Sequence, residues 1–420
     1  MSKTRISIIG EDFYINGQKT YPESPKNEVR GLLMNARFIQ GIFDAQDGRE
    51  RFNRYTRIFD PDRNTDDLIA QLPDWYRYGL RAFTVGLQGG GACFSFDDCA
   101  CYMNNPFSED GLSFDGAYAA RLDRLIRAAD ALGMAVIVNF FYFKQNPRIK
   151  DAAGILNALR TGLDFLLAGG YTNVLIDIAN EHDIRERGLH EIISTEEGMA
   201  TLIHIAKEHC QRRFPISCSF CGGAVKKQVA QAADFILIHG NGCSRQQYYT
   251  TVRRAREWAP GKPVVCNEDS QALGNMAASV RAHVSWGYYN NATKQEPPTD
   301  WSVRAGEDFF FANRMAMELG LPHDDIPAAE QVYLQGLAAD ETVDGKRWIR
   351  AASLFPEQID RVDFYLDGQP AYTCYDEPFS FRYESNWYMA PLHDREWRRK
   401  IKAVVHRRDG GVIELAGEKK

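Results

Sequence analysis

The chain has 420 residues, of which 44% are hydrophobic and 25% are charged, and its formal net charge at pH 7 is −6. This length is too great for one small domain and favours two domains, or a large α/β barrel with an appendage. The mildly acidic balance argues against a nucleic-acid partner, which normally requires a basic surface.

The first predicted element is a β-hairpin at residues 6–21. Asn16 and Gly17 stand between two alternating segments, and Asn-Gly is a strong two-residue turn signal because both residues accept a positive φ. We expect this hairpin to cover one end of the domain that follows.

From residue 29 to residue 320, segments typical of strands and helices alternate strictly. The strands are predicted at residues 29–41, 80–88, 134–143, 173–181, 215–222, 234–242, 262–270 and 286–291. The helices are predicted at residues 65–79, 114–133, 151–170, 195–213, 225–233, 244–259, 275–285 and 305–320, the first with Thr65 as its N-cap. Apolar strands joined by helical crossovers indicate a parallel sheet covered on its faces. Eight such units favour a (β/α)8 or TIM barrel over an open doubly wound sheet.

The pattern changes after Pro322. Short strand candidates separated by turn residues lie at residues 347–354, 361–374, 379–385, 400–411 and 412–417. This pattern is typical of a small antiparallel all-β sandwich. The sequence therefore predicts an α/β fold with two domains: residues 1–325 form the barrel with its N-terminal hairpin, and residues 326–420 form the sandwich.

Candidate catalytic residues follow from the barrel, because its active site forms at the carboxyl ends of the strands. Two predicted strands end in Asn-Glu: the fourth in Asn180-Glu181 and the seventh in Asn267-Glu268. These strands lie three positions apart in a ring of eight, so their ends face one another across the mouth. Two carboxylates that face each other across a pocket are what the hydrolysis of a glycosidic bond requires.

The alternation of side chains along a strand predicts where each glutamate points. In the fourth strand the alternation places Glu181 toward the barrel interior, on the same face as Leu175, Asp177 and Ala179. In the seventh strand it places Glu268 on one face with Val264 and Cys266, toward the interior. Asp269, the competitor of Glu268, then falls on the opposite face.

These two strand-end pairs resemble the pattern of the retaining β/α-barrel glycoside hydrolases of clan A, which include cellulase-like and β-galactosidase-like families. The resemblance covers residues 10–320, and residues 359–384 resemble the Ig-like modules often appended to such enzymes. It implies a double displacement with Glu181 as acid/base and Glu268 as nucleophile, and a sugar-binding role for Asn180. The expected partner is a carbohydrate substrate, and neither a cofactor nor a metal is expected.

Further substrate-binding candidates stand at other strand ends. Arg37 on the first strand is expected to orient a carboxylate, or else to form a surface salt bridge. Gln88 ends the second strand, His239 the sixth and Tyr289 the eighth, and a long segment after the eighth strand could bring Trp301 over the site. Aromatic rings such as Tyr289 and Trp301 suit the apolar face of a sugar, although they are also ordinary core residues.

Two other functions stay open. A metal-dependent barrel enzyme would hold a divalent cation with some of Glu181, His182, Asp183, His239 and Glu268. A non-catalytic carbohydrate-binding barrel protein would need neither glutamate as a catalyst. His182 and Asp183 are equally suited to capping the next segment, and the sequence carries no signal for an oligomeric state.

The segment at residues 89–116 is long enough for a functional lid. We expect it to close one end of the cleft and to favour short oligosaccharides or action at chain ends. It contains Cys93, Cys99 and Cys101, and the nine cysteines lack the spacing of a disulfide framework, so we expect them to be reduced. No run approaches the roughly 18 apolar residues of a membrane span. The chain start lacks the apolar core of a signal peptide, which favours the cytoplasm, or secretion if a leader has been removed.

Overall fold

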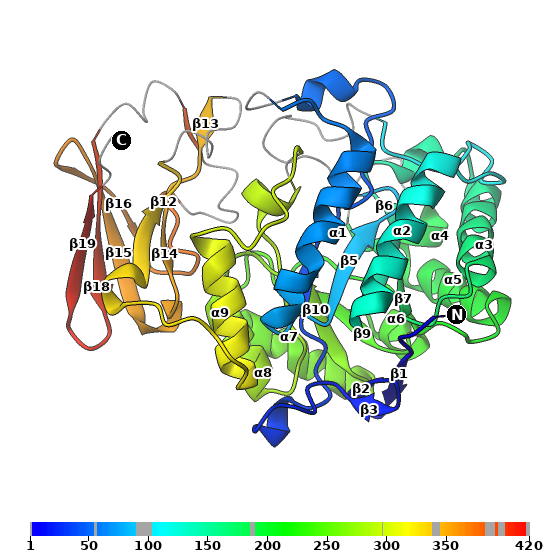
Figure 1. The fold of residues 1–420 in the computed structure, drawn as a ribbon, viewed down its shortest axis with the longest axis horizontal. Helices are drawn as coiled ribbons and strands as arrows, with labels where there is room; N and C mark the ends of the chain where they lie inside the picture. Colours follow the sequence, from blue (N-terminus) through cyan, green and yellow to red (C-terminus); the bar gives the residue numbers. More distant parts are fainter. Residues whose placement is uncertain are drawn as a thin grey trace.

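The computed structural model describes residues 2–53, 57–89, 103–184, 190–295, 297–337, 345–382, 391–393 and 400–416 (Figure 1). Within these ranges the chain forms an α/β barrel, followed by an antiparallel β region that lies beside helix α9. Residues 90–102 of the predicted lid, which include Cys93, Cys99 and Cys101, lie outside the described residues, and the lid prediction stays untested.

Eight parallel strands form the barrel in the described part of the chain. They are β4 (Asn35–Arg37), β5 (Ala82–Gly86), β6 (Ala135–Tyr142), β7 (Val174–Asn180), β8 (Ile216–Ser217), β9 (Ile236–His239), β10 (Val264–Glu268) and β11 (Gly287–Tyr288). Strands β11, β4, β5, β6, β7 and β8 are hydrogen-bonded in that order, and β9 pairs with β10. A parallel bridge from Val265 to Ser285 joins β10 to the segment entering β11, and the Asp234 amide donates to the Ile216 carbonyl between β9 and β8. The ring is thus closed in chain order, which confirms the predicted (β/α)8 fold.

Helices follow the strands on the outside of the ring (Figure 1). They are α1 (Pro61–Arg77), α2 (Gly116–Leu132), α3 (Ala152–Ala168), α4 (Glu191–Ser194), α5 (Glu196–His209), α6 (Lys227–Ala232), α7 (Arg245–Trp258), α8 (Leu273–Arg281) and α9 (Glu307–Leu319). Short helical turns are η1 (Asn27–Val29), η2 (Arg49–Phe52), η3 (Asn146–Arg148), η5 (Ala328–Glu330) and η7 (Pro356–Gln358), and η4 (Asn291–Gln295) is a π-helix. Among the described residues, no helix combines the length and the hydropathy needed to cross a bilayer.

One predicted helix start is wrong. Helix α1 begins at Pro61 with Asp60 as its N-cap, and the Asp60 carboxylate accepts a hydrogen bond from the Arg63 amide. Pro61 suits the first helical position because its fixed φ matches the helix and its missing N–H would have no partner there. Thr65 therefore lies inside the first turns, where its hydroxyl donates to backbone carbonyls.

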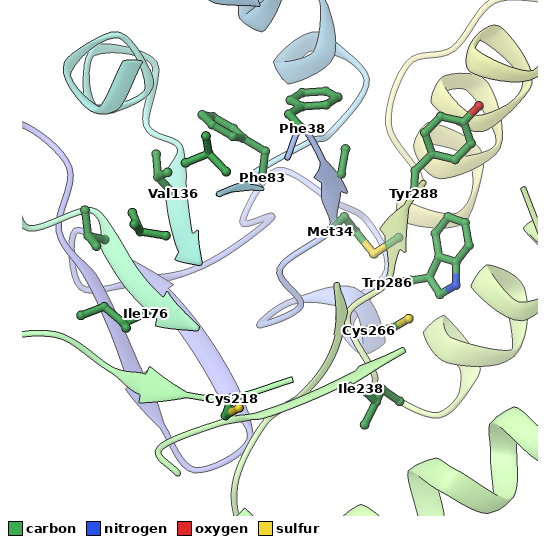
Figure 2. Packing of buried hydrophobic residues seen from close by; sticks show 14 of the residues in the cluster. Met34, Phe38, Phe83, Val136, Ile176, Cys218, Ile238, Cys266, Trp286 and Tyr288 are labelled. Carbon is green, nitrogen blue, oxygen red and sulfur yellow. The ribbon is translucent and has the colours of Figure 1, made fainter. Parts of the chain in front are cut away.

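Two apolar clusters hold the barrel together. The larger lies between the strands and the helices, and it contains Met34, Phe38, Phe83, Ile176 and Trp286 (Figure 2). The smaller fills the inside of the ring with Leu33, Ala82, Ala135, Ile137, Leu175, Phe235, Leu237 and Val265, and it is completed by Ile6 and Phe13.

Ile6 and Phe13 come from the N-terminal strands β1 (Ile6–Ile9), β2 (Asp12–Ile15) and β3 (Gln18–Lys19), at the bottom of Figure 1. Asn16 and Gly17 have φ values of 54° and 79°, as the predicted hairpin turn requires. The prediction that this hairpin covers one end of the barrel is confirmed.

The C-terminal part is built from antiparallel strands. The largest sheet has the order β16 (Gln369–Cys374), β15 (Ile359–Leu366), β18 (Ile401–Arg407) and β19 (Val412–Ala416). Two smaller pairs are β12 (Val332–Gln335) with β14 (Arg350–Ser353), and β13 (Lys346–Arg347) with β17 (Leu392–His393). Their shared core contains Ile349, Ala351, Val362, Phe364 and Val405, among others.

The all-β character predicted for the C-terminal part is confirmed, with one correction. In the segment predicted as a strand at residues 379–385, the described residues form a turn, and Ser380 makes only an isolated bridge to Arg350. The boundary between residues 325 and 326 stays a proposal; it falls in the segment between α9 and β12.

Candidate active site

A cavity of about 290 Å³ lies at the carboxyl ends of the barrel strands. Its lining is polar and partly aromatic, and comprises Arg37, Tyr142, Phe143, Asn180, Glu181, Gly222, Asn241, Gly242, Glu268, Ser270, Tyr289, Asn291 and Gln295. Of the eight residues predicted from the sequence, this cavity brings together Arg37, Asn180, Glu181, Glu268 and Tyr289. Gln88, His239 and Trp301 are not in the lining.

Glu181 directly follows β7 and points into the cavity, as the alternation along the strand predicts. Its φ is 48°, in the left-handed region that non-glycine residues seldom occupy and that is enriched at functional sites. The Glu181 amide donates to the Ser219 hydroxyl at 3.2 Å, and that hydroxyl donates to the Asp177 carboxylate at 3.0 Å. Burial raises the pKa of Asp177 to about 6, although His239 and hydrogen bonds from Ser219 act in the opposite direction.

Glu268 reaches the cavity through a β-bulge. In the pairing of β10 with β9, Cys266 lies opposite Ile238 and Glu268 lies opposite His239, so Asn267 is an extra residue. Cys266 packs in the outer cluster near Ile238 (Figure 2), so the predicted inward orientation of Val264 and Cys266 is wrong. Val265 faces the interior instead. The extra residue reverses the alternation, and Glu268 thereby turns inward.

Two side chains hold the Glu268 carboxylate from opposite oxygens. Arg37 Nε lies 2.8 Å from Oε2, and Asn241 Nδ2 donates to Oε1 at 2.5 Å. Arg37 is buried, and its Nη2 also donates to Asn180 Oδ1 at 2.9 Å. Burial is the largest single influence and would lower the pKa of Arg37, but the charge of Glu268 together with those of Tyr289, Glu181 and Asp177 outweighs it, and the pKa is raised. Arg37 is thus a buried cation that joins the two strand ends.

His239 lies behind both glutamates and is fully buried. Its Nδ1 is 3.0 Å from Glu181 Oε1 and 3.7 Å from Glu268 Oε2. One ligand-type atom of each of these three residues lies within 4.8 Å of the other two. Burial lowers the pKa of His239, but the two carboxylates outweigh this effect and the pKa is raised.

Asp269 points away from the cavity. Its carboxylate accepts hydrogen bonds from Trp286 Nε1 at 2.9 Å and from Asn275 Nδ2 at 3.0 Å. Burial raises its pKa to about 7. These contacts make Asp269 a structural group on the outer side of β10. This is the face, opposite to that of Glu268, on which the sequence pattern placed it.

Two predicted substrate-binding residues lie elsewhere. Trp301 is buried, its ring packs 5.5 Å from Phe38, and its Nε1 donates to Asn64 at 3.1 Å, so the segment around it covers the outside of β4 and α1. Gln88 is buried, and its side chain accepts from the Tyr142 amide at 2.7 Å and donates to Asn105 at 3.0 Å. Both therefore fix the scaffold around the cavity.

His182 and Asp183 hold the segment after β7 and do not join the Glu181–His239–Glu268 cluster. His182 Nδ1 lies 3.2 Å from the Ile193 carbonyl, and Asp183 accepts from the Cys221 amide at 2.8 Å. Both contacts are structural, but neither residue caps the next helix, α4, which has no side-chain cap.

Several lining residues were not among the predicted site residues. Asn241 stands two residues beyond the end of β9. Tyr142 ends β6 and Phe143 follows it, and their ring centroids are 4.4 Å apart. Both positions are strand ends of the barrel, so this simple rule would have found them. Asn291 and Gln295 belong to the π-helix η4, for which the sequence gives no signal.

No family model and no curated protein matches the chain. Similar solved structures include the tri-modular endo-β-1,4-glucanase B from Bacillus halodurans, at 10% identity over 93% of this chain and 78% of that chain, with a TM-score of 0.47. They also include the endo-β-1,4-mannanase from Thermotoga petrophila, at 11% identity over 93% and 98% of the two chains, with a TM-score of 0.46.

Proposed function

We propose that the protein is a retaining glycoside hydrolase, with Glu268 as nucleophile and Glu181 as general acid/base. The supporting observation is that a carboxylate oxygen of Glu181 and one of Glu268 lie within 4.8 Å of each other at a cavity. Retaining enzymes hold their two carboxyl groups about 5–5.5 Å apart, whereas inverting enzymes need roughly 6.5–9.5 Å to admit a water molecule between them. Two carboxylate oxygens within 4.8 Å of each other leave little room for a water molecule between them, which supports a covalent intermediate.

The contacts of the two glutamates suit different roles. Arg37 and Asn241 stabilise negative charge on Glu268 and fix its orientation, which suits an ionised nucleophile. Glu181 is the more exposed of the two, with 17% of its side chain accessible against 8% for Glu268. This exposure suits a group that exchanges a proton with the leaving group and then with water.

The reaction proceeds in two displacements. A Glu268 oxygen attacks the anomeric carbon, the bond to the leaving oxygen breaks, and the Glu181 proton passes to that oxygen. Water then attacks the anomeric carbon, gives its proton to Glu181, and releases Glu268 as a carboxylate. Asn180, held by Arg37, faces the cavity where a sugar hydroxyl would lie.

The test is a panel of aryl β-glycosides and of β-1,4-linked gluco- and manno-oligosaccharides, followed by proton NMR of the first-formed sugar. The proposal predicts turnover of at least one compound with retained anomeric configuration. Inversion would refute the nucleophile assignment. Binding without turnover of any compound would favour the non-catalytic carbohydrate-binding alternative.

A metal-dependent barrel enzyme is the second candidate, because Glu181, His239 and Glu268 could offer one ligand atom each within 4.8 Å. Arg37 argues against it, since its guanidinium already lies 2.8 Å from Glu268 and would repel a divalent cation. Activity that is lost with a chelator and restored by one added metal would favour this candidate. Activity that is unchanged by the chelator would exclude it.

A further inference from the structure

Arg350, the first residue of β14, connects the C-terminal β region to helix α9 of the barrel. Arg350 is buried, and its guanidinium forms a two-point ion pair with Glu307, the first residue of α9: Nε contacts Oε1 and Nη2 contacts Oε2. Glu307 is also buried. A two-point arginine–carboxylate pair fixes the orientation of both groups in addition to attracting them.

Glu307 also contacts the segment that follows β11. Its Oε2 lies 3.5 Å from Asn290 Nδ2, and the same amide nitrogen is 3.0 Å from the Tyr288 hydroxyl and 3.2 Å from Asp308 Oδ1. Asp308 in turn accepts from Tyr288 at 2.7 Å and from Lys294 Nζ at 2.8 Å. The result is a buried network in which Arg350 and Lys294 balance two carboxylates.

Asn290 stands next to the cavity wall. It directly precedes the π-helix η4: its carbonyl accepts from the Lys294 amide at 2.8 Å, and its Oδ1 accepts from the Thr293 amide at 3.3 Å. Its chain neighbours Tyr289 and Asn291 line the cavity, as does Gln295 at the end of η4. A shift of Asn290 would therefore move three lining residues together.

We propose that Arg350 is a positioning residue of the active site: through Glu307 it holds Asn290, and thereby the wall formed by Tyr289, Asn291 and Gln295. The C-terminal β region is then a working part of the substrate-binding cavity and not an independent module. The kinetic part of this inference rests on the proposed glycosidase function, whereas the structural part does not.

The test compares two full-length variants. The double variant Arg350→Met/Glu307→Gln removes both charges of the pair, so that neither is left buried without its partner. The control is Arg314→Met. Arg314 also joins α9 to the β region, since it pairs with Glu357 at 2.7 Å and donates to the Leu354 carbonyl at 3.0 Å, and neither partner lines the cavity.

In steady-state kinetics on the best aryl glycoside, we expect the double variant to raise KM by about tenfold with kcat within about twofold. The reason is that the wall binds the ground state and the transition state alike. The control should leave KM within about twofold of the wild-type value. An unchanged KM in the double variant, or the same rise in both variants, would overturn the proposal.

Hydrogen–deuterium exchange of the peptide that covers residues 287–295 tests the positioning without any turnover. We expect faster exchange in the double variant than in the wild type and in Arg314→Met. If the wild type cleaves no glycoside, the proposed function fails, yet this exchange comparison still decides the positioning role. Equal exchange in all three proteins would refute it. Arg350→Lys keeps the charge without the two-point geometry, and it replaces the double variant if that protein does not fold; the same direction of change is expected.

Discussion

The two Asn-Glu pairs at the ends of β7 and β10 are alike in sequence and different in structure. At β7 both residues line the cavity, and Glu181 turns in through a left-handed backbone conformation. At β10 a bulge at Asn267 turns only Glu268 inward. The side-chain amide group of Asn267 is buried and has no hydrogen-bond partner among the described residues. The same dipeptide therefore supplies two cavity-lining side chains at one strand end and one at the other, because the local backbone decides which side chains reach the cavity.

The largest expected effect is that of Glu268→Ala. Loss of the nucleophile should lower kcat/KM on the order of 10⁵–10⁶-fold for every aryl glycoside, since no other group can form the covalent intermediate. The control is Asp269→Asn, whose side chain lies on the opposite face of β10 and should retain activity. An active Glu268→Ala protein beside an inactive Asp269→Asn protein would reverse the assignment of these neighbours.

Glu181→Ala tests the other strand end. Its loss should lower kcat/KM by roughly 10²–10⁴-fold for substrates with poor leaving groups, because only these need protonation by a general acid. A dinitrophenyl glycoside should be affected much less in its first step, and added azide should speed the second. Equal losses with good and poor leaving groups, together with no azide effect, would remove Glu181 from the acid/base role.

Substitution of Asn180 and of Asn267 tests whether the two Asn-Glu pairs differ in function as they differ in structure. Asn180→Ala removes a cavity-lining polar group that Arg37 orients; the loss of a sugar contact worth about 1.5–3 kcal/mol would lower kcat/KM by roughly 10- to 100-fold. Asn267→Ala should stay within about threefold of the wild type, since the bulge is a property of the backbone. Similar losses in both variants would mean that the two pairs act alike.

A smaller effect is expected where the β region meets the segment after β10. Glu377 is half-buried there with its Oε2 fully covered, its carboxylate accepts from the Gly274 amide at 2.9 Å, and burial of the carboxyl raises its pKa from 4.5 to about 8. The folded state therefore binds more protons than the unfolded state between these values, and stability is lost as the pH rises through this window. Glu377→Gln keeps the acceptor without the titration, so its Tm advantage over the wild type should grow by a few degrees between pH 5 and pH 8.

Thermal unfolding across this pH range checks the prediction. Glu330→Gln, which alters an exposed carboxyl in η5, is the matched control and should show a constant difference from the wild type. A Tm difference for Glu377→Gln that is the same at pH 5 and pH 8 would contradict the burial of a titrating carboxyl at this interface.

Much of the fold could be predicted because its signals are local. Alternating apolar strands and amphipathic helices define the barrel, and the Asn16-Gly17 and Asp367-Gly368 turns have the positive φ values that their sequences favour. The strand-end rule also brought Glu181 to the cavity, because β7 keeps its register with β6.

What the sequence did not predict depends on partners that are distant in the chain. The bulge at Asn267 exists only in the pairing of β10 with β9, so the simple alternation pointed Cys266 the wrong way. Trp301 donates a hydrogen bond to Asn64 and packs on Phe38. The position of an aromatic residue in a loop does not predict these contacts. The ion pair of Arg350 with Glu307 joins the C-terminal β region to the barrel, and the sequence pattern predicts these as two separate domains.

The most direct test of Glu268 as the nucleophile is trapping with a 2-deoxy-2-fluoro glycosyl fluoride of the best-cleaved sugar. The fluorine disfavours the charged transition state and slows the second displacement, so the covalent intermediate accumulates and can be located by peptide mass spectrometry. We expect one label, on Glu268, in the wild type and in Asn267→Ala. A label on Glu181 or Asp269, or time-dependent turnover with no label and an inverted product, would contradict it.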